Sequence, residues 1–186
     1  MRKQAKGTGR EARFAQLYND AYEDLLRFVQ RRAGPDQAED IVHDVFVVAW
    51  RRFDDMPSES SDARAWLFGT ARNCLLAEQR IHHQRGALAI RMAAEAEAFV
   101  ASPDDSIALQ LDIATAWGRL TPDHQEALAL TAWENLTSSQ AGKVLGISAV
   151  AFRVRLHRAR ASLRRALGNT TATTTTDQYS ATEQLT

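Results

Sequence analysis

The stretch LTSSQAGKVLGISAVAFRVRLHRARASLRRAL, residues 136–167, largely decides the fold prediction. It contains two helical patterns separated by the tripeptide Gly146-Ile147-Ser148. Gly146 can adopt the left-handed conformation that ends a helix, and Ser148 can cap the next helix. Ile147 is apolar and can fill the angle between the two helices. This pattern predicts a helix-turn-helix, in which the second helix enters the DNA major groove.

The second predicted helix is both amphipathic and basic. One stripe at helical spacing is expected to be buried and consists of Phe152, Leu156, Ala159 and Leu163. Residues 149–167 contain six arginines and one histidine but no acid. The residues expected at DNA are Ser148, Arg153, Val154, Arg155, His157, Arg158 and Arg160. Among them, Arg153 suits a guanine edge and Val154 a thymine methyl, while the other arginines suit phosphates. The alternative interpretation is a solvated charged face.

The rest of the chain also follows helical spacing, and no alternating strand pattern was found. A first helix is expected over residues 14–33, ended by Gly34-Pro35. Asp36, with Glu39 three residues later, predicts a capped second helix over residues 36–53. A polar loop over residues 54–62 precedes a third helix over residues 63–83. The predicted fold class is therefore all-α.

Composition divides the chain into two small helical domains joined by a flexible linker. An N-terminal helical bundle is expected over residues 14–85 and a C-terminal helix-turn-helix domain over residues 113–167. The linker between them, residues 86–112, is predominantly acidic. A basic arm, residues 1–13, and a Thr-rich tail, residues 168–186, are expected to be disordered.

Composition also excludes several classes of function. Cys74 is the only cysteine, so neither an internal disulfide nor a zinc motif of paired cysteines can form. The sequence has no secretion signal and no apolar run long enough to cross a bilayer, so a cytoplasmic location and no membrane insertion are expected. We identify no catalytic set, phosphate-binding glycine loop or metal-ligand cluster. We therefore expect no catalytic residue, metal or cofactor, and the enzyme alternative has no support.

Two further stretches accompany the helix-turn-helix: QAEDIVHDVFVVAWRRFDDM at residues 37–56 and ARAWLFGTARNCLLAEQR at residues 63–80. Together with residues 136–167, and in this order and spacing, they resemble the extracytoplasmic-function (ECF) sigma factors of bacterial RNA polymerase. The resemblance implies that residues 14–85 bind core polymerase and recognise and melt the −10 element. It implies that residues 113–167 read the −35 element. The implied partners are core RNA polymerase, promoter DNA and an anti-sigma factor, and the implied location is at the nucleoid.

The resemblance assigns polymerase binding to one side of the second helix. The residues concerned are Glu39, Asp40, His43, Asp44, Val47 and Trp50. Acids suit a basic partner, and a tryptophan suits the centre of an interface. The alternative places Trp50 in the core and leaves the acids as a solvated face. His43 departs from the family, in which glutamine is usual at this position.

The resemblance assigns −10 recognition to the predicted loop and the helix that follows it. The residues concerned are Asp55, Ser58, Ser60, Arg64, Arg72, Asn73, Arg80, His83 and Arg85. Strand opening requires a pocket for an extruded base and a basic surface for the separated strand. Trp66 and Phe68 are aromatic and suit base stacking, with the core as the alternative for both.

Three further questions stay open at the level of the sequence. A regulator that binds duplex operator DNA as a dimer explains the helix-turn-helix but leaves residues 14–85 without a role. The acidic linker resembles the family's connector toward the polymerase active centre, but a plain spacer fits equally well. Gly142 stands where alanine is usual in the family, and it either permits a close approach or weakens its helix.

Overall fold

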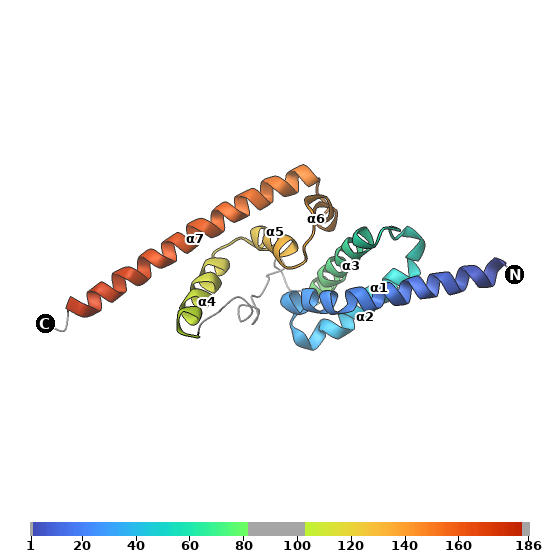
Figure 1. The fold of residues 1–186 in the computed structure, drawn as a ribbon, viewed down its shortest axis with the longest axis horizontal. Coiled ribbons are helices and arrows are strands. Elements are labelled where there is room, and N and C mark those ends of the chain that lie inside the picture. The colour runs from blue at the N-terminus through green and yellow to red at the C-terminus, as the bar shows by residue number, and fades with distance from the viewer. Residues whose placement is uncertain (1, 82–102, 184–186) are drawn as a thin grey trace.

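The computed structural model describes the backbone of residues 2–81 and 103–183, and the side chains of residues 9–80 and 111–168. Over these ranges every regular element is a helix (Figure 1). Their order is α1 (Arg2–Ala33), α2 (Pro35–Arg51), the 3₁₀ turn η1 (Phe53–Asp55), α3 (Ser60–Ile81), α4 (Pro103–Gly118), α5 (Pro122–Ala132), α6 (Ser138–Leu145) and α7 (Ala149–Glu183). The predicted all-α fold with two helical domains is confirmed.

The first bundle consists of α1, α2 and α3, which pack against one another. Its centre is aromatic and aliphatic: Phe28 and Phe68 are fully buried, with ring centroids 5.0 Å apart. The turn between α1 and α2 differs from the prediction. Gly34 precedes the helix with φ 92°, a left-handed value that favours glycine, and Pro35 is the first helical residue. Asp36 therefore lies inside the first turn of α2 and is not its cap.

The start of α1 corrects a second expectation. Residues 1–13 were expected to be disordered, whereas α1 begins at Arg2. The contacts of two arginines hold the last part of this segment against the bundle. Arg10 donates a hydrogen bond to the carbonyl of Trp50 and lies over its ring, 4.6 Å from the centroid. Arg13 donates to the carbonyl of Pro57. These long-range contacts attach this part of α1 to the end of α2 and the following loop.

The second bundle consists of α4 to α7, in which α7 packs against the other three helices. Its local signals act as predicted. The Thr137 side chain and Gln140 form a reciprocal capping box at the start of α6. Gly146 ends α6 in the left-handed conformation, with φ 69°. The Ser148 hydroxyl accepts a hydrogen bond from the Ala151 N–H at the start of α7.

Two boundaries of the second bundle differ from the prediction. Residues 103–112 were expected in the linker, but α4 begins at Pro103, because proline is favourable in the first turn of a helix. Residues 86–102 of the predicted linker lie outside the described part of the chain. Residues 168–186 were expected to be disordered, but α7 continues to Glu183. Extending an existing helix requires no new nucleation, which offsets the weak helix propensity of threonine.

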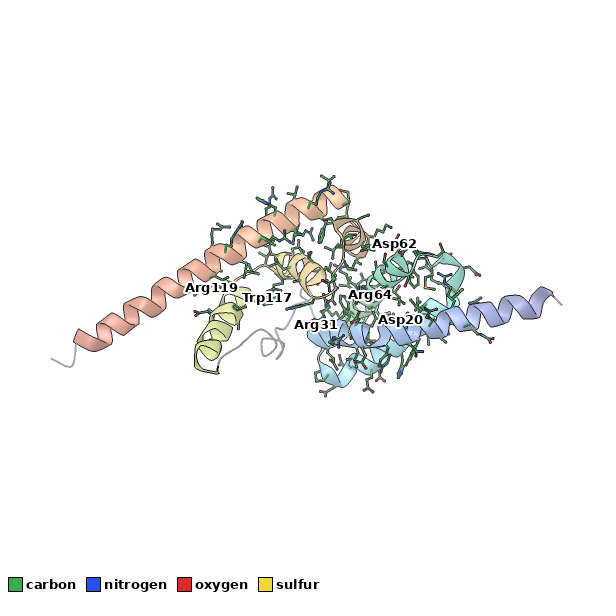
Figure 2. All side chains as sticks on the ribbon, in the orientation of Figure 1. Asp20, Arg31, Asp62, Arg64, Trp117 and Arg119 are labelled. Atoms are coloured by element: carbon green, nitrogen blue, oxygen red, sulfur yellow. The ribbon has the colours of Figure 1, made fainter. Side chains whose placement is uncertain are left out.

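The two bundles pack against each other through α3 and α6, at the centre of the molecule in Figure 1. Figure 2 shows Arg31 at the end of α1 and Asp62 at the start of α3, where the second bundle meets the first. The apolar core is shared, since Leu67 and Phe68 from α3 belong to the same buried cluster as Val144 from α6.

Candidate nucleic-acid interface

The recognition helix of the helix-turn-helix is the first part of α7. Its predicted buried stripe is confirmed: Phe152, Leu156 and Ala159 are buried and Leu163 is partly buried. Burial of that stripe turns the opposite face of α7 outward. The exposed residues predicted to bind DNA are Ser148, Arg153, Val154, His157, Arg158 and Arg160. Arg155 differs, because it is half-buried and pairs with Asp123 of α5 at 3.5 Å.

The turn that orients α7 depends on a close backbone approach at Gly142. A Cβ atom on Gly142 would lie 2.9 Å from the carbonyl oxygen of Ile147 and 3.3 Å from the nitrogen of Ala149. The N–H of Ile147 donates to the Gly142 carbonyl at 2.9 Å. Of the two readings of this glycine, the structure supports the close approach. Gly142 therefore helps to set the angle between α6 and α7.

The side of α2 predicted to bind polymerase is exposed. All six residues point away from the bundle: Glu39, Asp40, His43, Asp44, Val47 and Trp50. Trp50 is nevertheless supported from beneath. Its ring lies edge-on to Phe14, with centroids 5.0 Å apart, and Arg10 covers it. Trp50 is thus a surface residue held in place by α1, and not part of the core.

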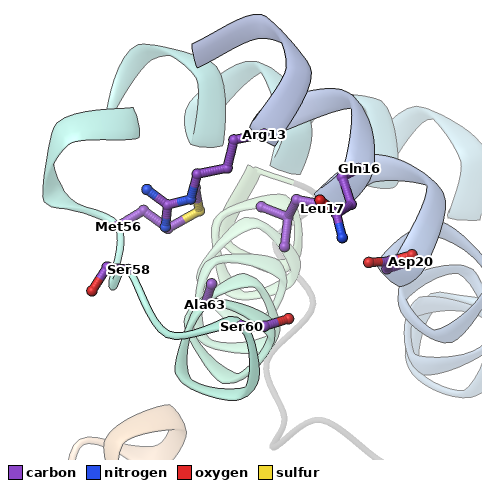
Figure 3. Close-up of a pocket in the computed structure, with 8 residues that line it drawn as sticks. All are labelled: Arg13, Gln16, Leu17, Asp20, Met56, Ser58, Ser60 and Ala63. Carbon is purple, nitrogen blue, oxygen red and sulfur yellow. The ribbon is translucent and has the colours of Figure 1, made fainter. Parts of the chain in front are cut away.

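A hollow of about 150 Å³ lies between α1 and the segment that joins η1 to α3. Figure 3 shows Arg13, Gln16 and Asp20 on its α1 side, and Ser58 and Ser60 on the other side. Its apolar lining comes from Leu17, Met56 and Ala63. The hollow combines hydrogen-bond donors and acceptors with an apolar floor, a mixture that suits a planar polar ligand. Ser58 and Ser60 were predicted as hydrogen-bonding groups, whereas the contribution of α1 was not.

The residues predicted on α3 differ in accessibility. Asn73 and Arg80 are exposed, and Arg72 is half-buried. Asp55, in η1, is exposed and pairs with Arg52 at 3.0 Å. Phe68 is fully buried, so it belongs to the core and is unavailable for stacking. His83 and Arg85 lie outside the described residues.

Arg64 is held by both bundles. Its Nε and Nη2 atoms donate to Asp24 at 3.0 and 2.6 Å, and its Nη1 atom donates to the carbonyl of Glu134 at 2.7 Å. Burial alone would raise the pKa of Asp24, but the hydrogen bonds from Arg64 and Arg27 hold it below its usual value. In this arrangement Arg64 is a structural bridge between the bundles.

Helix α6 covers part of the α3 surface. The Gln140 amide donates to Ser61 and Asp62 at 3.1 and 3.2 Å, and Lys143 approaches Asp62 at 3.4 Å. The hydrogen bond from Gln140 has the larger effect and that from Lys143 the smaller, and both lower the pKa of the Asp62 carboxyl. A cavity of about 220 Å³ lies between α3 and α6, with Trp66 and Asn73 in its lining. The half-buried Trp66 lines this cavity.

The sequence did not predict a buried ionic cluster that joins the end of α1 to α5 and the segment after it. Arg31 pairs with Glu134 at 2.8 Å, and Arg32 pairs with Glu126 at 3.0 Å. Burial raises the pKa of Glu134, against the opposing effect of Arg31 and Arg32. Burial likewise lowers the pKa of Arg32, although the nearby Glu126 carboxylate acts to raise that pKa. The paired basic residues at the end of α1 were the only available signal, and their partners lie far along the chain.

Two other features of the described chain bear on function. Within residues 9–80 and 111–168, no group of three or more His, Cys, Asp or Glu side chains is arranged to hold a metal ion. None of the described helices combines the length and apolar character that crossing a membrane requires.

Family comparisons match both bundles. Residues 17–83 match Sigma-70 region 2, and residues 110–163 match Sigma-70, region 4. These ranges correspond to the first bundle and to the helices α4 to α7 that surround the helix-turn-helix. The two matches occur in the order predicted from the sequence.

Individual relatives agree with these matches. The ECF RNA polymerase sigma factor SigL of Mycobacterium tuberculosis is 29% identical over 152 residues, which cover 80% of this chain and 85% of SigL. The RNA polymerase sigma factor CnrH of Cupriavidus metallidurans is 30% identical over 135 residues, covering 67% of this chain and 70% of CnrH.

Among solved structures, the sigma factor RpoE, in complex with the anti-sigma factor NepR from Bartonella quintana, superposes with a TM-score of 0.61 at 27% identity. The superposition covers 83% of this chain and 96% of RpoE. Its fold therefore extends over both bundles. The regulator alternative explains only the helix-turn-helix and is not favoured. The chain belongs to the ECF sigma factors, which bind core RNA polymerase and direct it to promoters for transcription initiation.

Proposed function

We propose that the exposed side of α2 is the surface that binds core RNA polymerase. The observation that carries this proposal is the exposure of Glu39, Asp40, His43, Asp44, Val47 and Trp50 on one side of a single helix. Carboxylates accelerate and orient association with a basic partner, and a pre-positioned aromatic side chain suits the centre of an interface. Because α1 supports Trp50, binding need not order that side chain.

The −10 element is proposed to bind next to the hollow between α1 and the loop before α3. Ser58 and Ser60 line this hollow and supply hydroxyls for an extruded base. Arg72, Asn73 and Arg80 on α3, with Arg64, His83 and Arg85, supply the polar and basic surface for the separated strand. Asp55 lies in η1, at the edge of the same region.

We propose that the exposed face of α7 binds in the major groove of the −35 element. Ser148, Arg153, Val154 and His157 lie near the start of the helix, where base edges are reached. Arg158 and Arg160 lie farther along, where phosphates run. Arg155, which pairs with Asp123 in the chain by itself, is proposed to contact a phosphate at the side of the groove. In functional terms, residues 14–85 serve polymerase and the −10 element, and residues 113–167 serve the −35 element.

Promoter binding further requires α6 to leave α3. Arg64 donates to the Glu134 carbonyl, and Asn73 lies in the cavity that α6 borders. Arg64 is therefore held away from DNA until the contact opens, whereas Asn73 is exposed but bordered by α6. Opening also frees the two bundles to reach DNA elements that are separated along the promoter.

The remaining assignments concern partners and setting. The factor itself performs no covalent chemistry, which is left to the polymerase, and it needs no cofactor. An anti-sigma factor is a proposed partner, because the similar RpoE is held by NepR. The proposed location is the cytoplasm, at the nucleoid, where promoter DNA and polymerase are found.

Charge reversal on α2 tests the polymerase surface. The double variant Asp40→Lys/Asp44→Lys should lose most of its binding to core polymerase in a pull-down, since both carboxylates are exposed on the proposed interface. Glu11→Lys/Glu23→Lys makes the same change in net charge at two exposed positions of α1 and should bind normally. Equal binding by the two double variants, both shown to be folded by circular dichroism, would remove α2 from the interface.

A further inference from the structure

Two valines stand out on the exposed face of the recognition helix. Val150 is 61% exposed and Val154 is 45% exposed. They are four residues apart, so they lie on the same side of α7 in its first two turns. Burial of large apolar side chains is favourable, and within the described residues no other segment covers this pair. The valines therefore present an apolar strip to a partner outside the chain.

The orientation of this strip is fixed by the rest of the domain. Phe152 and Leu156 bury the opposite side of α7 in the bundle. The Ser148 cap and the close turn at Gly142 hold the start of the helix. The valines thus cannot turn inward without unpacking the core.

The charges around the strip identify the partner. Arg153, His157 and Arg158 are exposed on the same face, and residues 149–167 contain no acid. An apolar protein surface would leave these cations without counter-charges, whereas duplex DNA supplies phosphates at the edges of its groove. The major groove offers one apolar group to a side chain, the C5-methyl of thymine. Charge complementarity therefore favours DNA as the occupant.

We propose that Val150 and Val154 read the methyl groups of two thymines in the −35 element, which makes Val150 an additional specificity-determining residue. This proposal rests on the proposed placement of α7 in the major groove. Four residues of helix span about 6 Å, and base pairs rise by about 3.4 Å. The two thymines should therefore lie on neighbouring base pairs or be separated by one pair.

The test exploits deoxyuridine, which differs from thymidine only by the missing methyl group. Holoenzyme assembled from core polymerase and the full chain first selects duplexes from a pool with a randomised −35 element. The selected duplexes are then prepared with thymidine or deoxyuridine at each −35 thymine. Removal of each contacted methyl should weaken binding by the wild-type holoenzyme about threefold to fourfold, as expected for one apolar carbon.

Substitution then links each methyl to its valine. Val150→Ala and Val154→Ala should each become insensitive to deoxyuridine at one position and retain sensitivity at the other. Leu111→Ala removes an equally exposed apolar side chain from α4 and should retain sensitivity at both positions. A non-additive double-mutant cycle between side chain and methyl is the expected signature.

The possible outcomes distinguish a failure of the methyl contacts from a failure of the proposed placement of α7 in the major groove. If wild-type binding is selective for sequence but indifferent to deoxyuridine, or if the valine variants keep full sensitivity, the methyl contacts are wrong while the placement of α7 stands. A selected −35 element without thymines would also overturn the proposal. If holoenzyme selects no −35 sequence at all, the placement itself fails.

Discussion

The guanidinium of Arg31, at the end of α1, donates a 2.8 Å hydrogen bond to the carboxylate of Glu134, which follows α5. The two side chains are 6% and 2% exposed, so the pair is buried between the bundles. Arg31 also lies over the ring of Trp133, 4.9 Å from its centroid. This pair connects the first bundle to the bundle that contains the helix-turn-helix.

Removal of one member of this pair should lower the free energy of unfolding and weaken the contact between the two bundles. Arg31→Ala removes the closest cation from the buried Glu134 carboxylate and leaves Arg32 at 4.0 Å, with Arg64 also nearby. Breaking a buried pair in this way costs about 3–5 kcal/mol, and the lower end is expected because Arg32 remains. Urea unfolding should register the loss, and hydrogen exchange should rise in α3 and α6, which meet at the interface.

The matched control lies on the same helix. Arg27 forms an exposed pair with Asp24, and Arg27→Ala should cost less than about 1 kcal/mol. The double variant Arg31→Met/Glu134→Leu removes both charges and should recover much of the stability. Equal stability of Arg31→Ala and Arg27→Ala would show that the buried pair does not hold the bundles together.

The sequence predicted features whose causes are local. Thr137 and Gln140 cap α6, and Gly146 ends it, because each acts on backbone within a few residues. The Arg31–Glu134 pair joins residues 103 positions apart, and in the sequence both look like ordinary solvated charges. No periodicity encodes such a contact.

The difference between local and long-range causes also explains why the starts of α1 and α2 differ from the prediction. Helix α1 begins at Arg2, earlier than predicted. Arg10, within this early part of the helix, contacts Trp50, which lies 40 positions farther along the chain. Asp36 resembled a cap, but the Gly34-Pro35 pair before it starts α2 two residues earlier than a cap at Asp36 would require. At the candidate site, the exposed sides of α2 and α7 followed from helical spacing. The α1 side of the hollow could not, because it depends on packing.

The Asp24–Arg64 contact predicts a pH dependence. Hydrogen bonds from Arg64 and Arg27 lower the pKa of Asp24 from 3.8. The resulting stabilisation is present above the unfolded pKa and is lost as pH falls through the lower folded pKa. Asp24→Asn should therefore be less stable than wild type at neutral pH, and the difference should shrink between about pH 5 and pH 1. Urea midpoints across this range measure it, and a constant difference would contradict the assignment.

The close turn at Gly142 predicts that alanine destabilises the protein at this position but not at Gly69. Gly142→Ala adds a Cβ against the Ile147 carbonyl, and such overpacking costs about 1–3 kcal/mol, more than the helix propensity it gains. Gly69→Ala meets only Val144 Cα at an ordinary 3.8 Å and should be neutral or stabilising. Thermal unfolding of both variants provides the measurement. A rise in Tm for Gly142→Ala would contradict the close approach.

The hollow between α1 and the loop predicts a defect confined to strand opening. Ser58→Leu/Ser60→Leu should fill the hollow and remove its hydroxyls while α2 still binds polymerase. Permanganate reactivity of unpaired thymines should fall roughly tenfold, equivalent to about 1.4 kcal/mol. Asp54→Leu, an exposed position that does not line the hollow, is the control. Unchanged reactivity in the double variant would make the loop a simple connector.

The most direct test of the central claim is permanganate footprinting of a promoter selected from a randomised library, with core polymerase and the chain supplied separately and together. We predict unpaired thymines at the −10 element, and a defined transcript, only when both are present. Protection of the −35 element should likewise depend on the polymerase. The assignment as a sigma factor would be contradicted if the chain alone protected duplex DNA as a dimer, failed to co-purify with core polymerase, and left the −10 element closed in its presence.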